Sequence, residues 1–434
     1  MNIFGYSLSL KAKEREKVVV IGMGYVGFPL ACAIAKNRKY EVYGYDLDKK
    51  KINKIKKRIS PVEDKQAEKD IKKVTIHASY NESVLNNAKY VIICVPTPVY
   101  ENKKPDLTPV IGASKAITRH LKKGQFVILE STVNPGVSEE VVLPILESSG
   151  LKRGKDFELI HCPERINPGD EKWNVYNIPR NIGGLTKEGN KKAADFYRSF
   201  INAKINEVSS LKAAEATKII ENSFRDVNIA FVNELAQSFD KMGINLQEVI
   251  QGASNKPYAF MPHFPGCGVG GHCIPVDPYY LIQRAEEAGF DHKLLKIARE
   301  VNNYMPEYTV RKLVVALKEK GINIKGTKVG ILGLSYKANI GDMRESPALD
   351  IKHLLIKLGA KVSCCDPHCN GNADAKIDEI LENCVGVIIA TNHREFLDIK
   401  DWKNVKVIVD GRNCLKEADL SNKIAYSGIS LGGK

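Results

Sequence analysis

Short apolar runs alternate with amphipathic stretches between residues 17 and 208. The runs are rich in β-branched residues and bounded by turn residues, a pattern typical of buried parallel strands. They lie at 18–21, 42–45, 91–95, 126–129 and 159–161. Apolar positions at helical spacing predict helices between them, over 27–35, 49–58, 109–121 and 137–148. This repeated alternation of strand and helix predicts a doubly wound α/β sheet for residues 1–208.

The pattern changes over residues 209–305. Apolar residues keep helical spacing from 212 to 242 with no Pro or Gly, far longer than the mean globular helix of about 11–12 residues. A helix of this length is typical of a bridge between domains or of a dimer interface. A loop rich in Gly and Pro follows at 255–278, and a further helical run is predicted over 279–303.

A second and smaller α/β domain is predicted for residues 306–434. Its strands are expected at 328–332, 362–365, 387–390 and 405–409, with a helix at 348–358. The predicted fold class is therefore α/β, with two α/β domains joined by a central region built on a long helix. The two α/β zones could be distant copies of one architecture.

Composition places the chain among globular proteins. Its 434 residues suggest two to four domains, and 43% hydrophobic with 27% charged residues exclude disordered, collagenous and disulfide-scaffold classes. No window reaches the roughly 18 apolar residues of a membrane span, and the first residues lack a signal-peptide pattern. We therefore expect a cytoplasmic protein that does not insert into membranes.

The net charge and the spacing of the cysteines limit the kinds of ligand that the protein is expected to bind. The net charge of +14 comes mainly from lysines scattered along the chain, which argues against nucleic-acid binding and would attract a substrate that carries phosphates. No pair among the ten cysteines has CxxC spacing. Cys364, Cys365 and Cys369 cluster around His368 without a matching ligand pair, so we expect reduced, mostly buried thiols and no metal site.

The first chemical motif is the loop Gly22-Met23-Gly24-Tyr25-Val26-Gly27, between the first strand and the first helix. Gly22 permits a tight turn, Gly24 lets the backbone approach a pyrophosphate, and Gly27 allows close helix–strand packing. The helix N-terminus would supply N–H donors to the phosphates. Asp46, at the end of the second strand, can accept both ribose hydroxyls and would repel a 2′-phosphate. The motif predicts a Rossmann-like domain that binds NAD rather than NADP.

The second motif is the loop 266–278, in which Cys273 stands among several glycines. Glycines let a substrate approach the sulfur closely, and Asp277 could hold a water or accept a proton. The alternative is a buried, inert thiol. Lys218 and Asn222, four residues apart on the long helix, would place an ammonium and an amide on one face, suited to a developing oxyanion. The alternative is a lysine that faces solvent.

Further polar loops follow predicted strands, where α/β folds bind ligands. The loops at 94–98, 130–136 and 162–169 offer hydroxyls or carboxylates, and each taken singly could be an ordinary turn. In the third zone, the segments 333–337, 342–347 and 410–412 carry Lys and Arg, which suit phosphate or uracil-nucleotide recognition. The alternative there is a set of surface ion pairs.

With these motifs in order, the sequence resembles the UDP-glucose/GDP-mannose dehydrogenase family. The resemblance covers essentially the whole chain, through GMGYVG, VPTP, ESTVNPG, PERINPG, KIIEN, GGHCIPVDP, YKANIGDMRESP and DGRN. The segments PDLTP, PERINPGD and GGHCIPVDPYYL are most similar to the branch that oxidises UDP-N-acetylhexosamines, with UDP-N-acetylglucosamine as the first expectation. The UDP-glucose branch more often has a serine at the position of His272.

The resemblance implies an NAD-binding domain, a central dimerisation region and a C-terminal domain that binds the UDP moiety. It implies a homodimer, with a higher oligomer as an alternative. It also implies a four-electron oxidation of the sugar C6 hydroxyl to a carboxylate by two NAD⁺, through a thiohemiacetal and a thioester on Cys273. UDP-N-acetylmannosamine, UDP-N-acetylgalactosamine and UDP-glucose are the alternative substrates.

Carried over by position, the resemblance assigns residues to three groups. Catalytic roles fall to Cys273, Lys218, Asn222, Glu164, Asp277 and Thr132. Contacts to NAD fall to Gly22, Gly24, Tyr25, Val26, Gly27, Asp46, Thr97, Ser131, Thr132 and Arg344. Contacts to the substrate fall to Glu164, Arg165, Lys218, Asn222, Gly270, Lys337 and Arg412.

The chain departs from the UDP-glucose enzymes at two points. Those enzymes usually carry a second Glu four positions after the one matching Glu164, and Pro168 stands there in this chain. The arginine that those enzymes contribute from a partner subunit has no clear counterpart, and Lys256 and His263 are candidates by location only.

Two other functions compete with this interpretation. A two-electron β-hydroxyacid dehydrogenase shares the NAD domain and the Lys/Asn pair, but needs neither Cys273 nor the third domain. A non-catalytic protein that binds NAD or nucleotides would have no need to combine Lys218, Asn222, Cys273 and Asp277.

Overall fold

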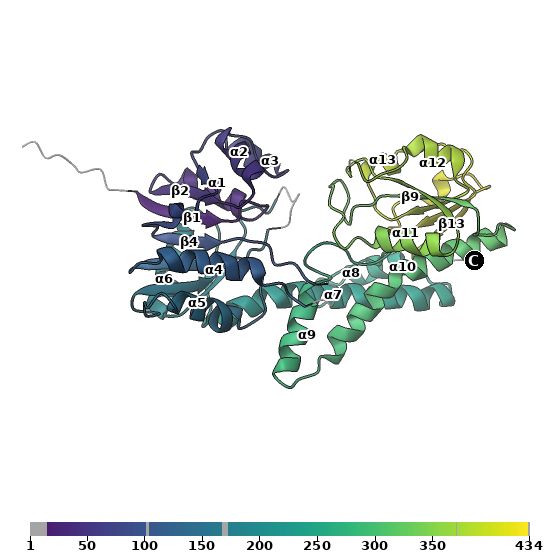
Figure 1. Cartoon of the computed structure of the whole chain (residues 1–434). Helices are drawn as coiled ribbons and strands as arrows, with labels where there is room; N and C mark the ends of the chain where they lie inside the picture. Colours follow the sequence, from purple (N-terminus) through teal and green to yellow (C-terminus); the bar gives the residue numbers. More distant parts are fainter. Residues whose placement is uncertain (1–14, 101–103, 167–171, 370, 433–434) are drawn as a thin grey trace, which may run out of the picture. The chain divides into compact units, whose positions relative to one another are not determined.

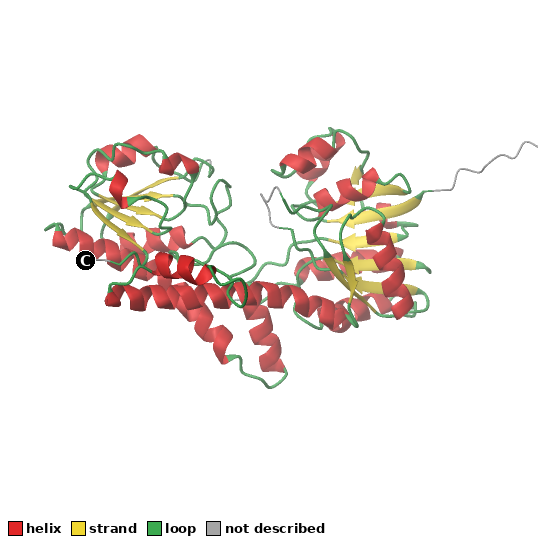
Figure 2. Ribbon diagram, turned by 180° about the vertical axis from the view of Figure 1, so that it is seen from behind, coloured by secondary structure: helices red, strands yellow, loops and turns green. Residues whose placement is uncertain are grey.

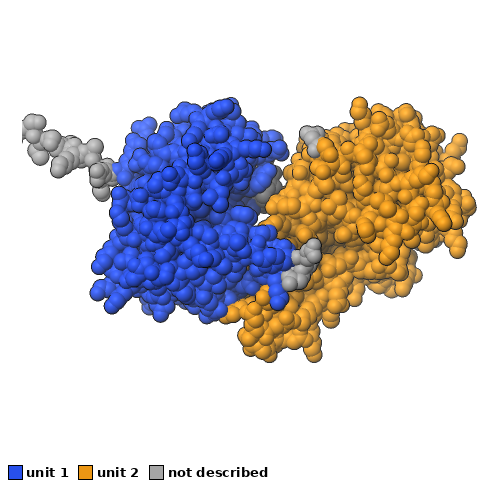
Figure 3. Space-filling view, viewed as in Figure 1, with its two compact units in different colours: residues 1–218 blue, residues 219–434 orange. Residues whose placement is uncertain are grey.

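The computed structural model describes residues 15–100, 104–166, 172–369 and 371–432. The chain divides into two compact units, residues 1–218 and 219–434, which are coloured separately in Figure 3. Each unit is built on its own sheet, and the ribbon views show helices packed beside the strands of both sheets (Figures 1 and 2).

The first unit contains an eight-stranded sheet of order β3-β2-β1-β4-β5-β6-β7-β8. Its strands are β1 (Glu16–Ile21), β2 (Tyr40–Tyr45), β3 (His77–Ser79), β4 (Tyr90–Ile93), β5 (Gln125–Leu129), β6 (Phe157–His161), β7 (Arg180–Gly184) and β8 (Ile205–Glu207). All neighbouring strands are parallel except β6 and β7, which are antiparallel. The carboxyl ends of β1 and of β4 to β6 therefore meet at one edge of the sheet.

Helices cover both faces of this sheet. They are α1 (Gly27–Lys36), α2 (Lys49–Lys56), α3 (Lys65–Asp70), α4 (Thr108–His120), α5 (Leu143–Glu147) and α6 (Lys187–Arg198), with a 3₁₀ turn at Glu82–Leu85 and a π turn at Ser138–Val142. Helices α1, α3 and α6 contribute to one apolar core, and α4 and α5 contribute to a second. Two separate cores on the strands β1 and β4 to β6 are the packing expected of a doubly wound sheet.

The second unit combines long helices with a five-stranded parallel sheet of order β10-β9-β11-β12-β13. The helices are α7 (Leu211–Met242), whose first turns belong to the first unit, α8 (Leu246–Ser254), α9 (Asp277–Glu287), α10 (Lys293–Glu319), α11 (Pro347–Lys357), α12 (Ile377–Asn383) and α13 (Arg394–Leu397). The strands are β9 (Lys328–Leu332), β10 (Lys361–Cys365), β11 (Gly386–Ile389), β12 (Val407–Asp410) and β13 (Ala425–Gly428). Within the described ranges no helix has the length and apolar character needed to cross a bilayer.

The two sheets begin in the same way. Gly22 follows β1 with φ +90° and donates its N–H to Tyr45 O at 2.8 Å, at the end of the neighbouring strand β2. Gly333 follows β9 with φ +93° and donates to Cys365 O at 2.8 Å, at the end of β10. The repeated turn supports the idea that the two α/β zones are copies of one architecture.

The predicted fold class is confirmed, and so are the predicted strands and the long helix to within a few residues. The predicted run over 279–303 is wrong as a single helix. It breaks after Glu287, where Gly289 has φ +84°, and α10 then continues through Pro306 to Glu319. Apolar side chains at helical spacing, such as Met305 and Leu313, are buried and hold α10 together on both sides of the proline.

The division into residues 1–208, 209–305 and 306–434 stays a prediction. Its second boundary lies inside α10, which continues through Pro306. The long helix α7 likewise crosses the boundary between the two compact units.

Alanine substitutions at two glycines of the first loop should have different effects on stability. A Cβ at Gly27 would lie 2.0 Å from Gly22 O, whereas a Cβ at Gly24 would meet nothing within 4 Å. Gly27→Ala should therefore lower the free energy of unfolding by at least about 1–3 kcal/mol through overpacking. Gly24→Ala should change it by less than about 0.5 kcal/mol. Urea unfolding of both variants measures the difference, and equal stabilities would contradict the packing described for this loop.

Candidate active site

The glycine loop of the first unit forms an open cradle at the start of α1. A Cβ at Gly22 would lie 2.7 Å from Cys94 O, so that turn requires glycine. The space beside Gly24 is open, and Tyr25 is half exposed. Val26 precedes α1 and provides no side-chain cap. The Phe28 N–H donates to Gly24 O at 3.1 Å and Pro29 has no N–H, so an anion here would meet the N–H groups of the loop and of Gly27. The loop therefore fits the pyrophosphate of a dinucleotide.

Asp46 fixes this cradle from the end of β2. Its Oδ2 accepts the N–H of Met23 at 2.8 Å, its Oδ1 accepts the N–H of Asp48 at 2.8 Å, and Lys51 Nζ lies 3.5 Å from Oδ2. The carboxylate thus lies against the glycine loop, as the sequence predicts for a ribose ligand. The residues present fit NAD.

Polar side chains follow β4 and β5 at the same edge of the sheet. Thr97 is buried after β4, and Ser131 after β5 donates its hydroxyl to Val95 O at 2.7 Å. The adjacent Thr132 is half-buried. The two loops are therefore tied to each other, and the predicted NAD contacts Thr97, Ser131 and Thr132 come from one edge of the sheet.

Glu215 fastens the loop after β5 to the first turns of α7. Its two carboxylate oxygens accept the N–H groups of Gly136 at 2.5 Å and of Ser138 at 2.7 Å. Glu215 is fully buried, and burial raises its pKa to about 6. Lys218 lies three residues further along α7, so this contact also fixes the start of Lys218's helix against the loop that carries Thr132.

Glu164 lies in the loop after β6 and is buried. It accepts a hydrogen bond from the N–H of Ile166. Burial raises the pKa of the Glu164 carboxyl, while the charges of Lys218 and Arg180 oppose that rise. The structure thus brings together two predicted catalytic residues, Glu164 and Lys218, as interacting charges within the first unit.

Two other predictions concern the same loop. Arg165 donates from Nη1 to Pro179 O at 2.9 Å, so part of its guanidinium is engaged by the chain itself. Pro168, where UDP-glucose enzymes usually carry a second Glu, lies outside the described residues.

In the second unit, the cysteine loop leads directly into α9. Asp277 is the first residue of α9, and its N–H donates to Cys273 O at 2.8 Å. Asn222 on α7 donates from Nδ2 to Asp277 Oδ2 at 2.6 Å, and both side chains are buried. Hydrogen bonds therefore connect Asn222 to Asp277, and Asp277 to the backbone of the predicted nucleophile Cys273.

The glycines beside Cys273 bring its loop against the segment after β9. Gly271 has φ +91°, donates its N–H to Arg344 O at 2.9 Å, and a Cβ there would lie 2.9 Å from the Tyr336 ring. Gly270 is packed as tightly, because its Cβ would lie 2.6 Å from Tyr336 Cβ. Cys273 interacts electrostatically with Arg344 and Tyr336. Arg344, predicted to contact NAD, thus lies close to the thiol.

Arg412 lies beside the same cysteine loop. Its Nε donates to Ala390 O at 2.8 Å, after β11, and its N–H donates to Asp410 Oδ1 at 3.0 Å. A Cβ at Gly266 would lie 3.0 Å from Arg412 Nη1. The predicted substrate residue Arg412 therefore borders the loop that contains Gly270, a second predicted substrate residue.

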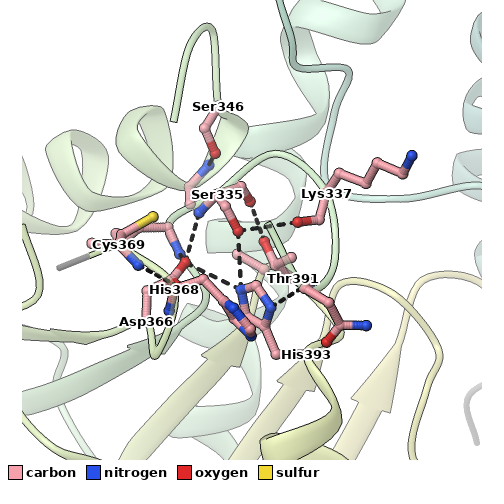
Figure 4. A network of polar contacts seen from close by, with 12 residues as sticks. Ser335, Lys337, Ser346, Asp366, His368, Cys369, Thr391 and His393 are labelled. Carbon is pink, nitrogen blue, oxygen red and sulfur yellow. Dashed lines mark hydrogen bonds and ion pairs between the residues drawn. The ribbon is translucent and has the colours of Figure 1, made fainter. Parts of the chain in front are cut away.

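Lys337 is presented by a loop that a buried polar network holds in place (Figure 4). Ser335 Oγ donates to Lys337 O at 3.2 Å and lies 3.0 Å from His393 Nε2, which is 3.2 Å from Asp366 Oδ2. His393 Nδ1 accepts the N–H of Asn339 at 2.8 Å. Figure 4 shows the Lys337 amine pointing away from this network. Serine and aspartate share one ring nitrogen, so the network is a scaffold for the loop and not a nucleophilic triad.

Sequence reasoning missed a group of fully buried residues near Glu164. Arg180 Nη1 lies 2.9 Å from Glu130 Oε2, and the Tyr197 hydroxyl donates to Glu130 Oε1 at 2.5 Å. Glu130 opens the ESTVNPG motif, from which only Ser131 and Thr132 were predicted as site residues. The one signal for Arg180 was a charged residue at the start of an otherwise uncharged segment, RNIGG.

Models of the three domains of one family match the chain in order. The UDP-glucose/GDP-mannose dehydrogenase family NAD binding domain matches residues 16–201. The central domain of the same family matches 212–304, and its UDP binding domain matches 330–417. The first unit therefore carries an NAD-binding domain, and a UDP-binding domain lies in the second.

Known proteins resemble the chain over nearly its whole length. A UDP-N-acetyl-D-glucosamine 6-dehydrogenase of Pseudomonas aeruginosa is 39% identical over 390 residues, which are 88% of this chain and 91% of that protein. The structure of a UDP-D-ManNAc dehydrogenase from Pyrococcus horikoshii aligns with TM-score 0.90 at 34% identity, covering 96% and 99% of the two chains. That of an NDP-N-acetyl-D-galactosaminuronic acid dehydrogenase from Methanosarcina mazei Go1 aligns with TM-score 0.86 at 31% identity, covering 96% of each.

The buried Glu215 makes a prediction about pH. Its pKa is raised from 4.5 to about 6 in the folded protein, so the folded state binds the proton more tightly than the unfolded state. The stability contributed by this group is therefore present below about pH 4.5 and is lost as the pH rises through about 6. The loss amounts to about 2 kcal/mol.

The measurement is the free energy of unfolding from about pH 4 to about pH 7. The stability of the native chain relative to Glu215→Gln should fall by about 2 kcal/mol over this range. Glu307→Gln, at a partly exposed carboxylate that pairs with Arg311, should show no such trend. Parallel curves for the native chain and Glu215→Gln would contradict the assignment.

Proposed function

The chain belongs to the UDP-glucose/GDP-mannose dehydrogenase family, and on that premise we propose that it oxidises the C6 hydroxyl of UDP-N-acetylglucosamine to a carboxylate. The members of this family are NAD-dependent nucleotide-sugar dehydrogenases. The observation that carries the proposal is the cysteine loop, in which Cys273 lies between close-packed glycines and the Asn222–Asp277 hydrogen bond at 2.6 Å. A two-electron alcohol dehydrogenase needs no such thiol.

The first unit would hold the dinucleotide. Gly22, Gly24 and Gly27 shape the cradle for its pyrophosphate, and Asp46 would bind the adenosine ribose. Thr97, Ser131 and Thr132 would line the nicotinamide side from the ends of β4 and β5. NAD⁺ supplies the hydride acceptor for each of the two oxidation steps.

The first oxidation converts the C6 alcohol to an aldehyde. The C6–H leaves as hydride, and the hydroxyl proton must pass to a base as the C–O bond gains double-bond character. Lys218 would stabilise the developing alkoxide, and Glu164 or a water that it holds would take the proton. Lys218 and Asn222 stand four residues apart on α7, so an ammonium and an amide face the same direction.

Cys273 would make the second oxidation possible. An aldehyde carbon cannot give up its hydride to yield an acid derivative until a nucleophile has been added to it. The Cys273 sulfur would attack C6 and form a thiohemiacetal, whose oxygen Lys218 and Asn222 would stabilise. Loss of the second hydride and of the hydroxyl proton then gives a thioester on Cys273.

Water would release the product. A water oriented by Asp277 or Glu164 would attack the thioester carbon. The bond between this carbon and sulfur then breaks, which frees the uronate and regenerates the Cys273 thiol. One alcohol, two NAD⁺ and one water become one carboxylate, two NADH and three protons, so electrons and atoms balance. Asp277 is held for this task by its hydrogen bond from Asn222.

The second unit would bind the nucleotide sugar. Lys337 and Arg412 would contact the UDP moiety, with Arg165 and Gly270 beside the sugar. UDP-N-acetylglucosamine is our first choice because relatives named for it reach 39% identity and because PERINPG and GGHCIPVDP resemble that branch. UDP-N-acetylmannosamine is the second candidate, favoured by the TM-score of 0.90 to the Pyrococcus horikoshii enzyme.

We also infer a homodimer from the surface of α7. Ile220, Phe224 and Phe231 are each about half exposed and recur at helical spacing, so they form an apolar stripe on one side of the helix. A second copy of the chain is the partner that the family resemblance suggests for this stripe. A cytoplasmic location stays a prediction.

Cysteine variants test the proposal. With UDP-N-acetylglucosamine and NAD⁺, Cys273→Ala should lower uronate formation by about a thousandfold or more, because no thioester can form. Its affinity for NAD⁺ should be unchanged. Uronate measured by mass spectrometry and NAD⁺ binding measured by calorimetry report the two effects.

Cys267→Ala is the matched control in the same loop. Cys267 is buried and directs its sulfur to Ala390 O at 3.4 Å, so its loss should leave uronate formation within about threefold of the native rate. Native turnover in Cys273→Ala, or equal losses in both variants, would contradict the role of Cys273.

A further inference from the structure

A charged group lies in the interior of the first unit, where no water can reach it. Glu130 directly follows β5, Arg180 begins β7, and Tyr197 lies on α6. All three have no exposed surface, and Glu130 receives both the guanidinium at 2.9 Å and the phenol at 2.5 Å. The mechanism described above uses none of them.

Stability alone does not account for this group. A buried ion pair seldom stabilises a fold more than apolar residues of the same size would, because both charges lose their hydration. Here the guanidinium is also incompletely paired, since Nε and Nη2 of Arg180 find no hydrogen-bond partner among the described residues. A buried charge with spare donors is a costly feature that calls for a functional reason.

The backbone points Arg180 toward Glu164. Strands β6 and β7 are antiparallel, with Ile160 opposite Gly184 and His161 opposite Gly183. Continuing this register by three residues would place Glu164 opposite Arg180. The two side chains do interact electrostatically, and the N–H of Glu164 donates to Glu130 O at 3.4 Å. The buried group therefore borders the carboxylate at the end of β6.

We propose that Arg180, clamped by Glu130 and Tyr197, is a positioning residue that opposes protonation of the buried Glu164. This inference rests on the proposed function, in which Glu164 accepts a proton or holds water. Arg180 would act through Glu164 and would not touch the sugar. Glu130 would limit its influence by neutralising part of the guanidinium charge.

The described titratable groups near Glu164 and Arg180 divide into those that are charged at pH 7 and those that are neutral. Lys218 faces it from α7, Arg180 from β7, and Glu130 and Cys94 from the ends of β5 and β4. Cys162 and Tyr197 face Arg180. Burial raises the pKa of Cys162 to about 12, raises those of Cys94 and Tyr197, and lowers that of His161 to about 3, so these four are neutral at pH 7. Among the described residues, the charged groups that act on Glu164 are Lys218, Arg180 and Glu130.

Two substitutions that each remove one charge should move the titration of Glu164 in opposite directions. Removing the positive charge in Arg180→Gln should move the acidic limb of the plot of kcat against pH to a pH about one unit higher. Removing the opposing negative charge in Glu130→Gln should shift it downward by about one unit. Arg198→Gln, at an exposed arginine on α6 that pairs with Asp195, should leave it in place.

The limb must first be shown to belong to Glu164. Glu164→Gln should abolish it, and a limb that persists in this variant would overturn the inference. A purely structural role for Arg180 would change stability or kcat without moving the limb, so unmoved limbs in both Arg180→Gln and Glu130→Gln would overturn it as well. If Arg180→Gln fails to fold, the shift in Glu130→Gln decides alone.

A readout without turnover separates this inference from the proposed function. The free energy of unfolding is measured against pH for the native chain, Glu130→Gln and Arg180→Gln, each with and without Glu164→Gln. The difference within each pair reports the titration of Glu164, and its midpoint should move in the same opposite directions. If these midpoints shift although the native chain forms no uronate, the proposed function fails and the inference stands. If uronate forms but the midpoints stay fixed, the inference alone fails.

Discussion

A carboxylate that binds backbone N–H groups sets the geometry on which both units depend. Asp46 directly follows β2 in the first sheet and holds the glycine loop by accepting the N–H of Met23. Asp366 directly follows β10 in the second sheet and accepts the N–H groups of Leu334 and Ser335 at 2.7 and 2.8 Å. In the first unit part of the carboxylate stays exposed, beside the open Gly24, which leaves room for a ribose. In the second, Asp366 is buried against His393, so the loop is rigid and presents Lys337 instead. One architecture thus serves two different ligands.

The long helix α7 carries predicted catalytic residues in both units. Glu215, Lys218 and Asn222 are spaced three and four residues apart, so they share one face of the helix. Glu215 holds the loop that carries Thr132, Lys218 interacts with Glu164, and Asn222 holds Asp277. In the proposed reaction, α7 would therefore carry the oxyanion-stabilising amine of Lys218 beside its contacts to a loop of the NAD domain and to the carboxylate that follows Cys273.

The sequence predicted those parts of the molecule that local pattern controls. Buried parallel strands are continuous apolar runs, and the glycine and cysteine loops carry residues that close packing demands, as at Gly27 and Gly271. Polar helices such as α3 and α6 left no such signal. The break before α10 was missed because apolar spacing continues on both sides of Gly289. The Arg180–Glu130–Tyr197 group was beyond reach, since its members are 50 and 67 residues from Glu130 and meet only in the folded sheet.

The yield of NADH per molecule of sugar consumed tests the central claim most directly. The assay compares UDP-N-acetylglucosamine with its mannosamine and galactosamine counterparts and with UDP-glucose, and counts NADH against the uronate formed. Cys273-dependent chemistry predicts two NADH per uronate, with UDP-N-acetylglucosamine as the preferred substrate. One NADH per sugar with release of an aldehyde, or no oxidation of any of the four, would contradict the account.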